Sequence, residues 1–555
     1  MIGRAAAFAV VALVCWAGTA AGVAAAQPDR EREQKRPNIV VVMTDDQTLE
    51  SMRVMDGVRR TLGEEGTTFE RAFVSNPLCC PSRSTLFTGQ YSHNHGVIGN
   101  TPPDGGYGRL DKTEWLPIWL QREGYRTVHI GKFLNRYGVD SPPTEVPPGW
   151  TEWYGSVDPS TYQFYGYTLN ENGILNTYGA DRNPLFYSTD YYAARARSVI
   201  ARMGDTRTPF FLSVAFLAPH SGGPRDADDP PRQATPSPAP RHVNRFAGEP
   251  VPFGPAFNEA DVSDKPSFIQ LRPPIGAARA RAIEENYRQR LESLLAVDEA
   301  VVGLVDSLRA ERELDNTLIV FTSDNGFFHG EHRLPNGKVL VYEPSIRVPL
   351  LMRGPGVPQD ARRRQLVTNA DLAPTILEAA GAKAGLPQDG RSLFGLMEDR
   401  GLEWGRDLLI EGAPGVNQPG YDALRTYRYV YVQYANGERE LYDLERDPDQ
   451  LTSLHSDPDY ARVQADLALR LGLLSVCRGR ACRARPSARL ALRNCKARVR
   501  GSGIDRVIFR SALRVREDRG RPFGSPVGGK RLRARVQTDD GRVVTLDRRL
   551  PGRCR

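Results

Sequence analysis

The feature that most restricts the fold of this 555-residue chain is a set of short, continuous apolar runs. The clearest is Asn38–Met43, and similar runs occur at Tyr125–Ile130, Phe210–Phe216 and Leu318–Thr322. Apolar runs without polar alternation are typical of strands that are buried on both faces, as in a parallel sheet covered by helices. The sequence therefore predicts such a sheet at the centre of the protein.

Helical patterns separate these runs. Glu284–Arg312 is the clearest, Leu116–Arg122 is shorter, and Asp371 is placed to cap a helix that runs through Leu377–Ala380. The helix predicted over Glu284–Arg312 carries apolar residues on one face, at Leu294, Val297, Val301, Val305 and Leu308. Strands that alternate with helices indicate an α/β fold.

Two long segments interrupt this alternation. Asp140–Asn183 is rich in Tyr, Trp, Gly and Pro, and Ser221–Pro274 is rich in Pro, Asp and Arg. We predict both as long loops. Their aromatic and charged residues suit the rim of a binding pocket, and ordinary surface packing explains them about as well.

The pattern changes after about residue 400. Tyr427–Val432 and Glu438–Asp443 are joined through Asn436-Gly437, which is a strong hairpin signal. A helix is predicted over Tyr460–Leu474, and from Arg489 onward the pattern contains strands and turns only. We expect a smaller antiparallel sheet with a helix, and then a small β-sandwich.

The predicted fold class is α/β, with a large mixed, mostly parallel sheet flanked by helices, a smaller C-terminal antiparallel sheet with a helix, and a short all-β module. A chain of 555 residues is too long for one compact core. The expected divisions are a signal peptide at 1–26, a linker at 27–36, a catalytic α/β domain at 37–400, its C-terminal subdomain at 401–484 and a basic all-β accessory module at 485–555.

The first residues have the order of a secretory signal. Met1–Arg4 carries a positive charge, Ala5–Ala21 is almost wholly apolar, and Ala24–Ala26 supplies the small residues of a cleavage site. An uncleaved anchor is the competing interpretation, but the segment consists mainly of alanine and has little of the Leu and Ile that favour a stable span. We expect the protein to be secreted or to lie at the cell surface.

Six cysteines remain after removal of such a signal. An oxidising compartment lets the four near the C-terminus pair. We expect the pairs Cys477–Cys482 and Cys495–Cys554, which are one of the connectivities that four cysteines allow. Cys79 and Cys80 stand apart from this group.

The C-terminal residues are strongly basic. Residues 485–555 contain 21 Lys or Arg and 6 Asp or Glu, a net charge of +15, so the preceding part carries −7 of the total of +8. Such a segment attracts polyanions, for example sulfated glycans or an acidic cell envelope. It has few aromatic residues and no recognisable nucleic-acid module, so sequence-specific nucleic-acid binding is not expected. An arginine-rich surface without a partner is the other interpretation.

Polar side chains follow the predicted strands where each strand ends. Asp45-Asp46 follows the first run and Asp324-Asn325 follows the last one. Because the carboxyl ends of parallel strands line the ligand crevice of a sheet, these four side chains are expected to converge. Oxygen ligands without His or Cys favour a hard cation, Ca²⁺ or Mg²⁺, over zinc.

Three cationic or neutral nitrogen side chains occupy similar positions. Lys132 and His220 follow two other predicted strands, and Lys338 lies shortly after Asp324-Asn325. Taken singly, each is as well explained by a surface or core position. As a set at strand ends, they indicate a pocket for an anion such as a sulfate or phosphate ester.

One stretch carries the nucleophile of this proposed chemistry. Cys79-Cys80-Pro81-Ser82-Arg83, followed by Leu86, Thr88 and Gly89, resembles the signature of type I sulfatases, which have an alkaline-phosphatase-like fold. The bland alternative is a buried thiol or half of a disulfide. The family's chemistry implies that a formylglycine-generating enzyme oxidises Cys79 to formylglycine (3-oxoalanine), whose hydrated aldehyde attacks sulfur.

Further motifs extend the resemblance from Arg36 to about Leu474. They are RPNIVVVMTDDQ, GYRTVHIGKFLNRYG, FLSVAFLAPH and FTSDNGFFHGEHRLPNGK, with VTNADLAPTIL and LYDLERDP as framework. The nearest likeness is to N-acetylglucosamine-6-sulfatases and heparan 6-O-endosulfatases, which share the CCPSR pair. Two positions depart from relatives: many arylsulfatases have a histidine where Leu134 stands, and glucosamine-type relatives often have one where Phe328 stands, next to His329.

The resemblance implies a role for each candidate residue. Calcium, or less readily magnesium, would be held by Asp45, Asp46, Asp324, Asn325 and the modified Cys79. Sulfate and the leaving group would contact Lys132, Lys338 and His220, and Arg83 would hold the nucleophile. The implied substrate is a sulfated carbohydrate, such as glucosamine 6-sulfate, or an aryl sulfate ester.

Two other functions are compatible with these motifs. The first is a related formylglycine-dependent phosphonate or phosphodiester hydrolase, although such relatives tend to use His in the metal set, where Asn325 stands here. The second is an inactive protein with a sulfatase fold that binds polyanions through its basic C-terminal module. The intact motifs favour the enzyme.

Overall fold

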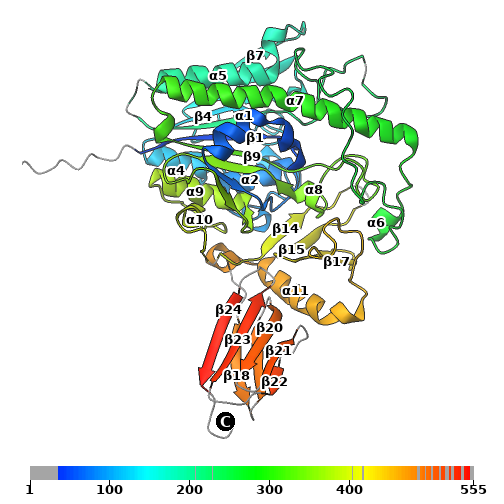
Figure 1. Cartoon of the computed structure of the whole chain (residues 1–555). Helices are drawn as coiled ribbons and strands as arrows, with labels where there is room; N and C mark the ends of the chain where they lie inside the picture. The colour runs from blue at the N-terminus through cyan, green and yellow to red at the C-terminus, as the bar shows by residue number, and fades with distance from the viewer. Residues whose placement is uncertain are drawn as a thin grey trace, which may run out of the picture. The chain divides into compact units, whose positions relative to one another are not determined.

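A large mixed sheet lies at the centre of the protein (Figure 1). The computed structural model describes residues 36–204, 206, 208–227, 229–402, 404–415, 418–483, 488–493, 496–501, 504–511, 514–518, 524–526, 531–538 and 543–549. Among these residues, ten strands form the central sheet in the order β12-β2-β11-β9-β1-β8-β4-β5-β6-β7.

The middle of this sheet is parallel and consists of the predicted apolar runs. β1 (Asn38–Thr44) pairs in parallel with β9 (Thr317–Ser323) on one side and with β8 (Phe210–Ala215) on the other, and β4 (Arg126–Gly131) pairs in parallel with β8. Every residue of β1, β8 and β9 is buried, as expected for strands covered on both faces. Antiparallel β11 (Leu350–Arg353) makes the sheet mixed. The predicted fold class is confirmed.

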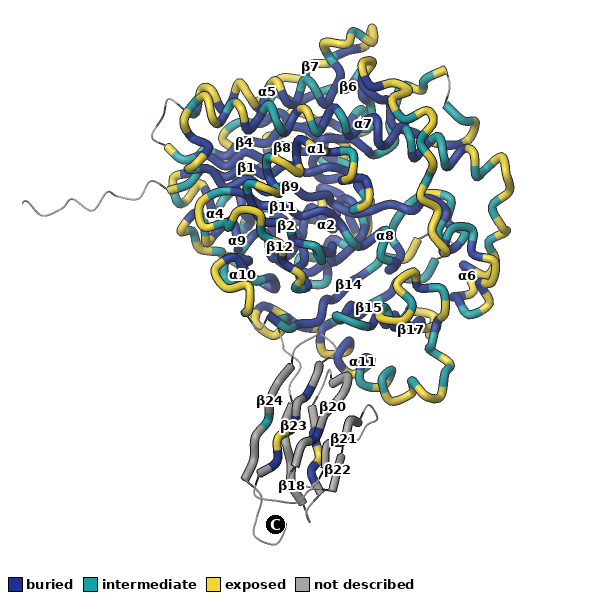
Figure 2. Tube along the Cα trace, viewed as in Figure 1, coloured by how far each residue is buried: buried dark blue, intermediate teal, exposed yellow. Residues whose placement is uncertain are grey.

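Helices cover both faces of the sheet (Figures 1 and 2). Alternate residues of β1 point into two separate cores. Val40 and Val42 belong to the core beneath α5 and α7, whereas Ile39 and Val41 belong to the core beneath α2, α4 and α9. The bounds of these helices are α5 (Ser188–Gly204), α7 (Ala277–Ala310), α2 (Cys79–Thr88), α4 (Leu116–Arg122) and α9 (Leu372–Ala380).

α7 begins earlier than its apolar stripe predicts. The pattern indicates a helix from Glu284, whereas α7 starts at Ala277, directly after its N-cap Gly276. The first turns consist mainly of alanine and arginine, which favour helix without adding large apolar residues to the stripe. The helix therefore extends beyond the part of it that its buried face reveals.

Asp371 caps its helix in a different way from the prediction. It is the third residue of a capping box on the turn η7 (Asn369–Asp371), in which the N-cap is Thr368. Its carboxylate also accepts hydrogen bonds from Arg406 at 2.9 and 2.8 Å. α9 then follows directly with Asp371 at its N-cap position, as predicted, although the Asp371 side chain makes no capping hydrogen bond to α9.

The segment 140–183 is not a loop, which corrects the prediction. It contains β5 (Glu152–Ser156), parallel to β4, and the antiparallel pair β6 (Tyr167–Glu171) and β7 (Ile174–Tyr178). Asn172-Gly173 turns between them with φ of 54° and 97°. This is the same dipeptide signal that marks the C-terminal hairpin, and the Tyr and Thr content also favours strands.

A four-stranded antiparallel sheet follows the central one, as predicted. Its strands are β14 (Leu408–Gly412), β15 (Tyr421–Arg425), β16 (Tyr429–Tyr434) and β17 (Arg439–Asp443). α11 (Ala461–Leu474) packs on one face of it, where Leu467 and Leu471 join a cluster with Leu424 and Tyr431. The other face joins the cluster that contains Phe328 and Tyr342.

The basic C-terminal residues form two antiparallel sheets. β19 (Lys496–Gly501) lies between β18 (Ala488–Arg493) and β22 (Gly524–Pro526). The second sheet has the order β21 (Arg514–Asp518), β20 (Ile504–Ser511), β23 (Arg531–Thr538) and β24 (Val543–Arg549). Buried residues alternate along its strands at Val507, Phe509, Leu532, Ala534 and Val536, as expected for strands with one buried face.

Shorter elements connect these parts. They are η1 (Glu50–Val54), α1 (Asp56–Val58), η2 (Arg59–Glu64), β2 (Thr67–Phe69), β3 (Ala72–Phe73), α3 (Ser92–His95), η3 (Tyr107–Arg109), η4 (Ser160–Tyr162), η5 (Pro184–Phe186), α6 (Ser267–Gln270), η6 (Leu314–Asn316), α8 (Glu343–Ile346), β10 (Arg347–Val348), β12 (Ala361–Arg363), β13 (Val367–Thr368), α10 (Phe394–Glu398), η8 (Pro458–Tyr460) and η9 (Gly479–Arg483). Within the described ranges, no helix has both the length and the apolar character needed to cross a membrane.

Cys477 and Cys482 form the predicted disulfide, with Cα atoms 5.1 Å apart. The predicted pair Cys495–Cys554 lies outside the described residues, as does the predicted signal peptide at 1–26. Cys79 and Cys80 are buried free thiols. The bland alternative of a disulfide at this motif is therefore wrong.

An ion pair connects α3 to the small sheet and the disulfide loop. His93 Nδ1 lies 2.8 Å from Glu411 Oε1, and His93 Nε2 lies 2.7 Å from the carbonyl oxygen of Cys477. Burial alone would lower the pKa of His93, but Glu411 and the Cys477 carbonyl outweigh burial and raise the pKa to about 9. Two acceptors on the two ring nitrogens suit a protonated imidazole.

We expect this ion pair to make the stability of the fold depend on pH. The unfolded-state pKa of histidine is about 6.5. The stabilisation is therefore fully present below that pH and is lost as the pH rises through about 9. Thermal denaturation at a series of pH values should show this loss for the natural protein and a flatter profile for His93→Gln. Identical profiles for the two proteins would contradict the assignment.

Candidate functional site

The carboxyl ends of β1 and β9 bring the predicted acidic residues together. The strands are parallel, with Thr44 opposite Ser323, so the pairs that follow them lie side by side. The backbone N–H of Asp46 donates to Asp324 Oδ1 at 3.1 Å, and Asn325 Nδ2 donates to Asp46 Oδ1 at 2.6 Å. Asp45 is buried beside them. The four predicted ligands thus form one cluster.

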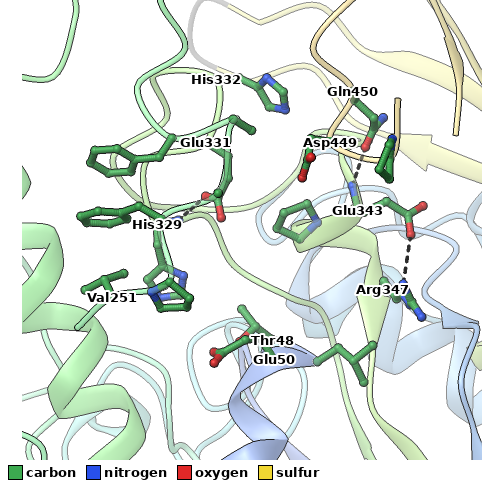
Figure 3. A pocket seen from close by; sticks show the side chains of 18 of the residues that line it. Thr48, Glu50, Val251, His329, Glu331, His332, Glu343, Arg347, Asp449 and Gln450 are labelled. Carbon is green, nitrogen blue, oxygen red and sulfur yellow. Dashed lines mark hydrogen bonds and ion pairs between the residues drawn. The ribbon is translucent and has the colours of Figure 1, made fainter. Parts of the chain in front are cut away.

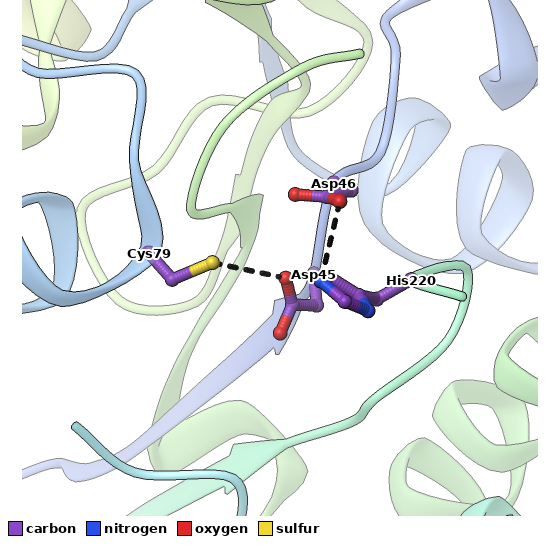
Figure 4. Close-up of side chains that lie close together, drawn as sticks. All are labelled: Asp45, Asp46, Cys79 and His220. Atoms are coloured by element: carbon purple, nitrogen blue, oxygen red, sulfur yellow. Dashed lines mark hydrogen bonds and ion pairs between the residues drawn. The ribbon is translucent and has the colours of Figure 1, made fainter. Parts of the chain in front are cut away.

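Cys79 is the first residue of α2, and its side chain points at this cluster (Figure 4). Its Sγ lies 3.6 Å from Asp45 Oδ1, 3.6 Å from Lys132 Nζ and 3.2 Å from Lys338 Nζ. α2 ends at Thr88, and its C-cap Gly89 has a φ of 68°, a left-handed conformation that glycine adopts without strain. Because Cys79 is the first residue at the other end, the helix presents its N-terminal end, and with it Cys79, to the carboxylates.

Arg83 lies one turn after Cys79 and joins the two acidic pairs. Its Nε donates to Asp324 Oδ2 at 2.9 Å, and its Nη2 lies 3.2 Å from Asp45 Oδ2. Its Nη1 donates to the carbonyl oxygen of Lys132 at 2.8 Å. Because Arg83 is only 2% exposed, the two carboxylates rather than water balance its charge. Arg83 thus fixes the orientation of Asp45 relative to Asp324.

The predicted lysines and the histidine complete the cluster. Lys132 forms an ion pair with Asp45, and Lys338 forms one with Asp46. His220 Nδ1 donates to the carbonyl oxygen of Ser221 at 2.6 Å, while its Nε2 lies 3.6 Å from Asp46 Oδ2. Burial lowers the pKa of His220 to about 4, even though Asp46 favours the charged form. His220 is therefore a neutral imidazole with its Nε2 toward the cluster.

The pKa values of Asp45 and Cys79 are shifted in opposite directions, although the two side chains are neighbours. Burial alone would raise the pKa of Asp45, but Lys132 and its neighbouring cations hold that pKa well below its usual range. Burial raises the pKa of the Cys79 thiol to about 12, and Asp45 acts in the same direction. An unmodified thiol here is neutral near pH 7 and thus a weak nucleophile.

The donor set fits a hard cation. Ligand atoms of Asp45, Asp46, Cys79 and His220 all lie within 4.8 Å of one another. Asn325 Oδ1 is buried and has no hydrogen-bond partner among the described residues. A buried amide oxygen without a partner is unfavourable unless a ligand binds it. Carboxylate and amide oxygens are the ligands that Ca²⁺ and Mg²⁺ prefer. His220, which the sequence predicts in the anion pocket and not among the metal ligands, also belongs to this group.

Two further residues contact the cluster without having been predicted. The Tyr162 ring lies 4.7 Å from Lys132 Nζ and 5.1 Å from the His220 ring. Arg290 of α7 donates to the carbonyl oxygen of Asp46 and is 3% exposed. Arg290 stands four residues before Leu294 on the apolar face of its helix, so a charge within that stripe was a usable signal. Tyr162 carried no such signal.

A cavity of about 400 Å³ opens beside the loops that follow Asp46 and precede Lys338 (Figure 3). Its wall comes from residues within 48–50, which follow Asp46, within 329–332, which precede Lys338, and within 251–257. The last part belongs to the second predicted loop, so that loop does contribute to a pocket. His329 packs edge-on against Tyr287, with ring centroids 5.3 Å apart, and lies in this wall.

Comparison with known proteins identifies the family. Residues 37–382 match the sulfatase family, and residues 330–476 match the C-terminal region of N-sulphoglucosamine sulphohydrolase. The chain belongs to the sulfatase family. It is therefore a sulfuric ester hydrolase, and the resemblance to type I sulfatases is confirmed. Members of this family typically use formylglycine and Ca²⁺.

Individual relatives cover most of the chain. Arylsulfatase of Volvox carteri is 34% identical over 85% of this chain and 79% of its own length. Human N-acetylglucosamine-6-sulfatase is 34% identical over 81% of this chain and 86% of its own length. A solved structure of a protein in complex with its substrate D-glucosamine-2-N,6-O-disulfate has a TM-score of 0.64 at 25% identity, covering 79% of this chain and 97% of that one.

The fold is also shared with other ester hydrolases. The phosphonate monoester hydrolase of Agrobacterium radiobacter has a TM-score of 0.59 at 21% identity, over 81% of this sulfatase and 96% of that chain. At this identity the likeness concerns the fold alone. The sheet alone therefore does not decide which ester is hydrolysed.

Replacing Arg83 by methionine should destabilise the protein strongly. Arg83→Met leaves Asp45 and Asp324 buried without their shared partner, so we expect the free energy of unfolding to fall by about 3–5 kcal/mol. Urea denaturation measures this change. Arg122→Met is the matched control, since Arg122 forms an ion pair with Glu114 while 56% exposed; its loss should change the free energy of unfolding only slightly. Equal effects of the two substitutions would refute the argument.

Proposed function

We propose that this sulfatase is exported and removes sulfate from a carbohydrate ester such as glucosamine 6-sulfate. The observation that carries the chemistry is the position of Cys79 Sγ between Lys132 and Lys338 and beside Asp45. The substrate class is supported by the human N-acetylglucosamine-6-sulfatase and by the structure with a bound glucosamine disulfate. The N-terminal signal pattern at 1–26 supports export, to the extracellular space or the cell surface.

The proposed cation ligands are Asp45, Asp46, Asp324, Asn325 and the modified side chain at Cys79. Calcium suits them better than magnesium, because a set rich in carboxylates with an amide leaves little of the coordination to water. When bound, the cation and formylglycine together supply an activated hydroxyl as the nucleophile. Formation of formylglycine from Cys79 requires a formylglycine-generating enzyme as a partner during maturation.

The remaining residues act on the substrate. Lys132 and Lys338 place two ammonium groups where the sulfuryl oxygens gain negative charge during the displacement. His220 Nε2 faces the same space, because its Nδ1 hydrogen is held by the Ser221 carbonyl. A bound sulfate ester, being an anion, favours protonation of Nε2, and the imidazolium then donates that proton to the departing alcohol. Arg83 keeps Asp45 and Asp324 in place at the nucleophile and so stays a positioning group of the cluster.

The divisions of the chain have different roles in this proposal. Residues 37–400 form the catalytic domain, 401–484 its C-terminal subdomain and 485–555 a basic module, after a linker at 27–36. We assign the basic module, with its net charge of +15, to contact with polyanions such as sulfated glycans, without sequence-specific nucleic-acid binding. Such a contact would retain the enzyme near its substrate.

Mass spectrometry of the peptide that spans Cys79 tests the nucleophile. In protein from a host that contains the generating enzyme, we expect the mass of the formylglycine form, and Cys79→Ala should lose essentially all sulfatase activity. A thiol that is wholly retained in active enzyme would disprove the mechanism. Turnover of an aryl sulfate should exceed that of the matching aryl phosphodiester, whereas the reverse order would establish the phosphodiesterase alternative.

Removing a cation ligand should abolish activity. We expect Asp324→Ala to lower kcat by a factor of about 10³ or more, because a positioned metal supplies several kcal/mol of transition-state stabilisation. Chelation of the natural enzyme should reduce activity, with restoration by added Ca²⁺ measured directly. Full activity of Asp324→Ala would show that the metal assignment is wrong. Asp315→Ala, on the turn before β9, is the control and should remain active.

A further inference from the structure

The backbone on both sides of Lys338 is in an uncommon conformation. Gly337 has a φ of 101° and Val339 has a φ of 88°. Glycine adopts such angles freely, but a β-branched residue does so only against steric strain. Strained residues persist where surrounding contacts determine the backbone, and they concentrate at functional sites. A contact from another part of the fold must therefore keep Val339 in this conformation.

That contact comes from the small antiparallel sheet. The hydroxyl of Tyr421, the first residue of β15, donates a hydrogen bond to the carbonyl oxygen of Val339. Tyr421 is 5% exposed and packs in the cluster that also contains Leu340 and Val341. The bond thus reaches from the core of the C-terminal sheet to the residue directly after Lys338.

Further contacts hold the residues that follow. Gln450 Nε2 donates to the carbonyl oxygen of Val341 at 3.3 Å. The Tyr342 hydroxyl donates to Glu440 Oε2 at 2.9 Å. These bonds fix the chain after Val339. On the other side, the Phe328 N–H donates to the Gly337 carbonyl at 2.8 Å, so a rotation at Val339 would move mainly the residue between the two held carbonyls. That residue is Lys338, whose Nζ lies 3.2 Å from Cys79 Sγ.

We propose that Tyr421 is a positioning residue for Lys338, holding the strained Val339 backbone so that the lysine ammonium stays at the reacting centre. The inference rests on the role of Lys338 in the proposed function. It makes the C-terminal sheet a part of the active site, although none of the described residues of that sheet contributes a side chain to the cluster around Cys79. Lysine has a long, flexible stem, so the direction in which its backbone launches it decides where its charge lies.

Tyr421→Phe tests the proposal by removing only the hydroxyl. We expect kcat/KM for 4-nitrophenyl sulfate to fall about tenfold, since small misplacements of a catalytic group have effects of this order or larger. Tyr434→Phe is the matched control: Tyr434 lies opposite Tyr421 in the same sheet, and its hydroxyl also donates to a buried oxygen, on Glu440. Its kcat/KM should change less than twofold. Equal losses in the two variants would overturn the proposal.

A second variant separates positioning from a general structural effect. Glycine favours positive φ about as readily as negative φ, so Val339→Gly removes the strain that Tyr421 opposes. The double variant Tyr421→Phe/Val339→Gly should therefore be more active than Tyr421→Phe alone. If it is equally active or less active, the clamp is not what holds Lys338. Circular dichroism melting confirms that each variant is folded.

Lys338→Ala distinguishes failure of this inference from failure of the proposed function. Loss of activity in Lys338→Ala together with no effect of Tyr421→Phe would overturn the clamp alone. Full activity of Lys338→Ala would remove the assigned role of Lys338 and the clamp with it. A loss in both, with rescue by Val339→Gly in the Tyr421→Phe background, is the expected result.

Discussion

The structure depends on a set of charges buried at the carboxyl edge of the central sheet. Asp45, Asp46 and Asp324 are almost wholly removed from water, a position in which an isolated carboxylate is very unfavourable. Arg83, Lys132 and Lys338 offset that cost by forming ion pairs with them. Each cation comes from a different part of the chain. The fold must therefore bring distant segments together to keep this cluster neutralised.

Each layer of the fold has a part in that task. Parallel pairing of β1 with β9 sets the acidic pairs side by side, and α2 directs Cys79 and Arg83 at them from the other side. Lys132 directly follows β4, and His220 lies five residues after the end of β8. The C-terminal sheet acts at longer range, through the backbone beside Lys338.

Strands and helices with one clear periodicity were predictable from the sequence. Where the prediction was wrong, the reason is physical. β1, β8 and β9 are continuous apolar runs because both their faces are covered. The β5–β7 region was predicted as a loop because its short strands are rich in polar and aromatic residues, although Asn172-Gly173 marked the hairpin. α7 extends beyond its stripe because its first turns need no apolar face.

The sequence by itself determined which residues come together at the site proposed for the chemistry. Cys79 and Arg83 are neighbours on one helix, and Asp45, Asp324, Lys132 and His220 follow strands, so local order and strand ends were enough to assemble them. Only the tertiary structure decided the places of Tyr162, Arg290 and Tyr421. The contacts join residues that are 30 positions apart for Tyr162 and Lys132, 82 for Tyr421 and Val339, and 244 for Arg290 and Asp46. Local periodicity can mark such a residue, as the apolar stripe of α7 marks Arg290, but it does not identify the partner, because the pair forms only when separate elements pack together.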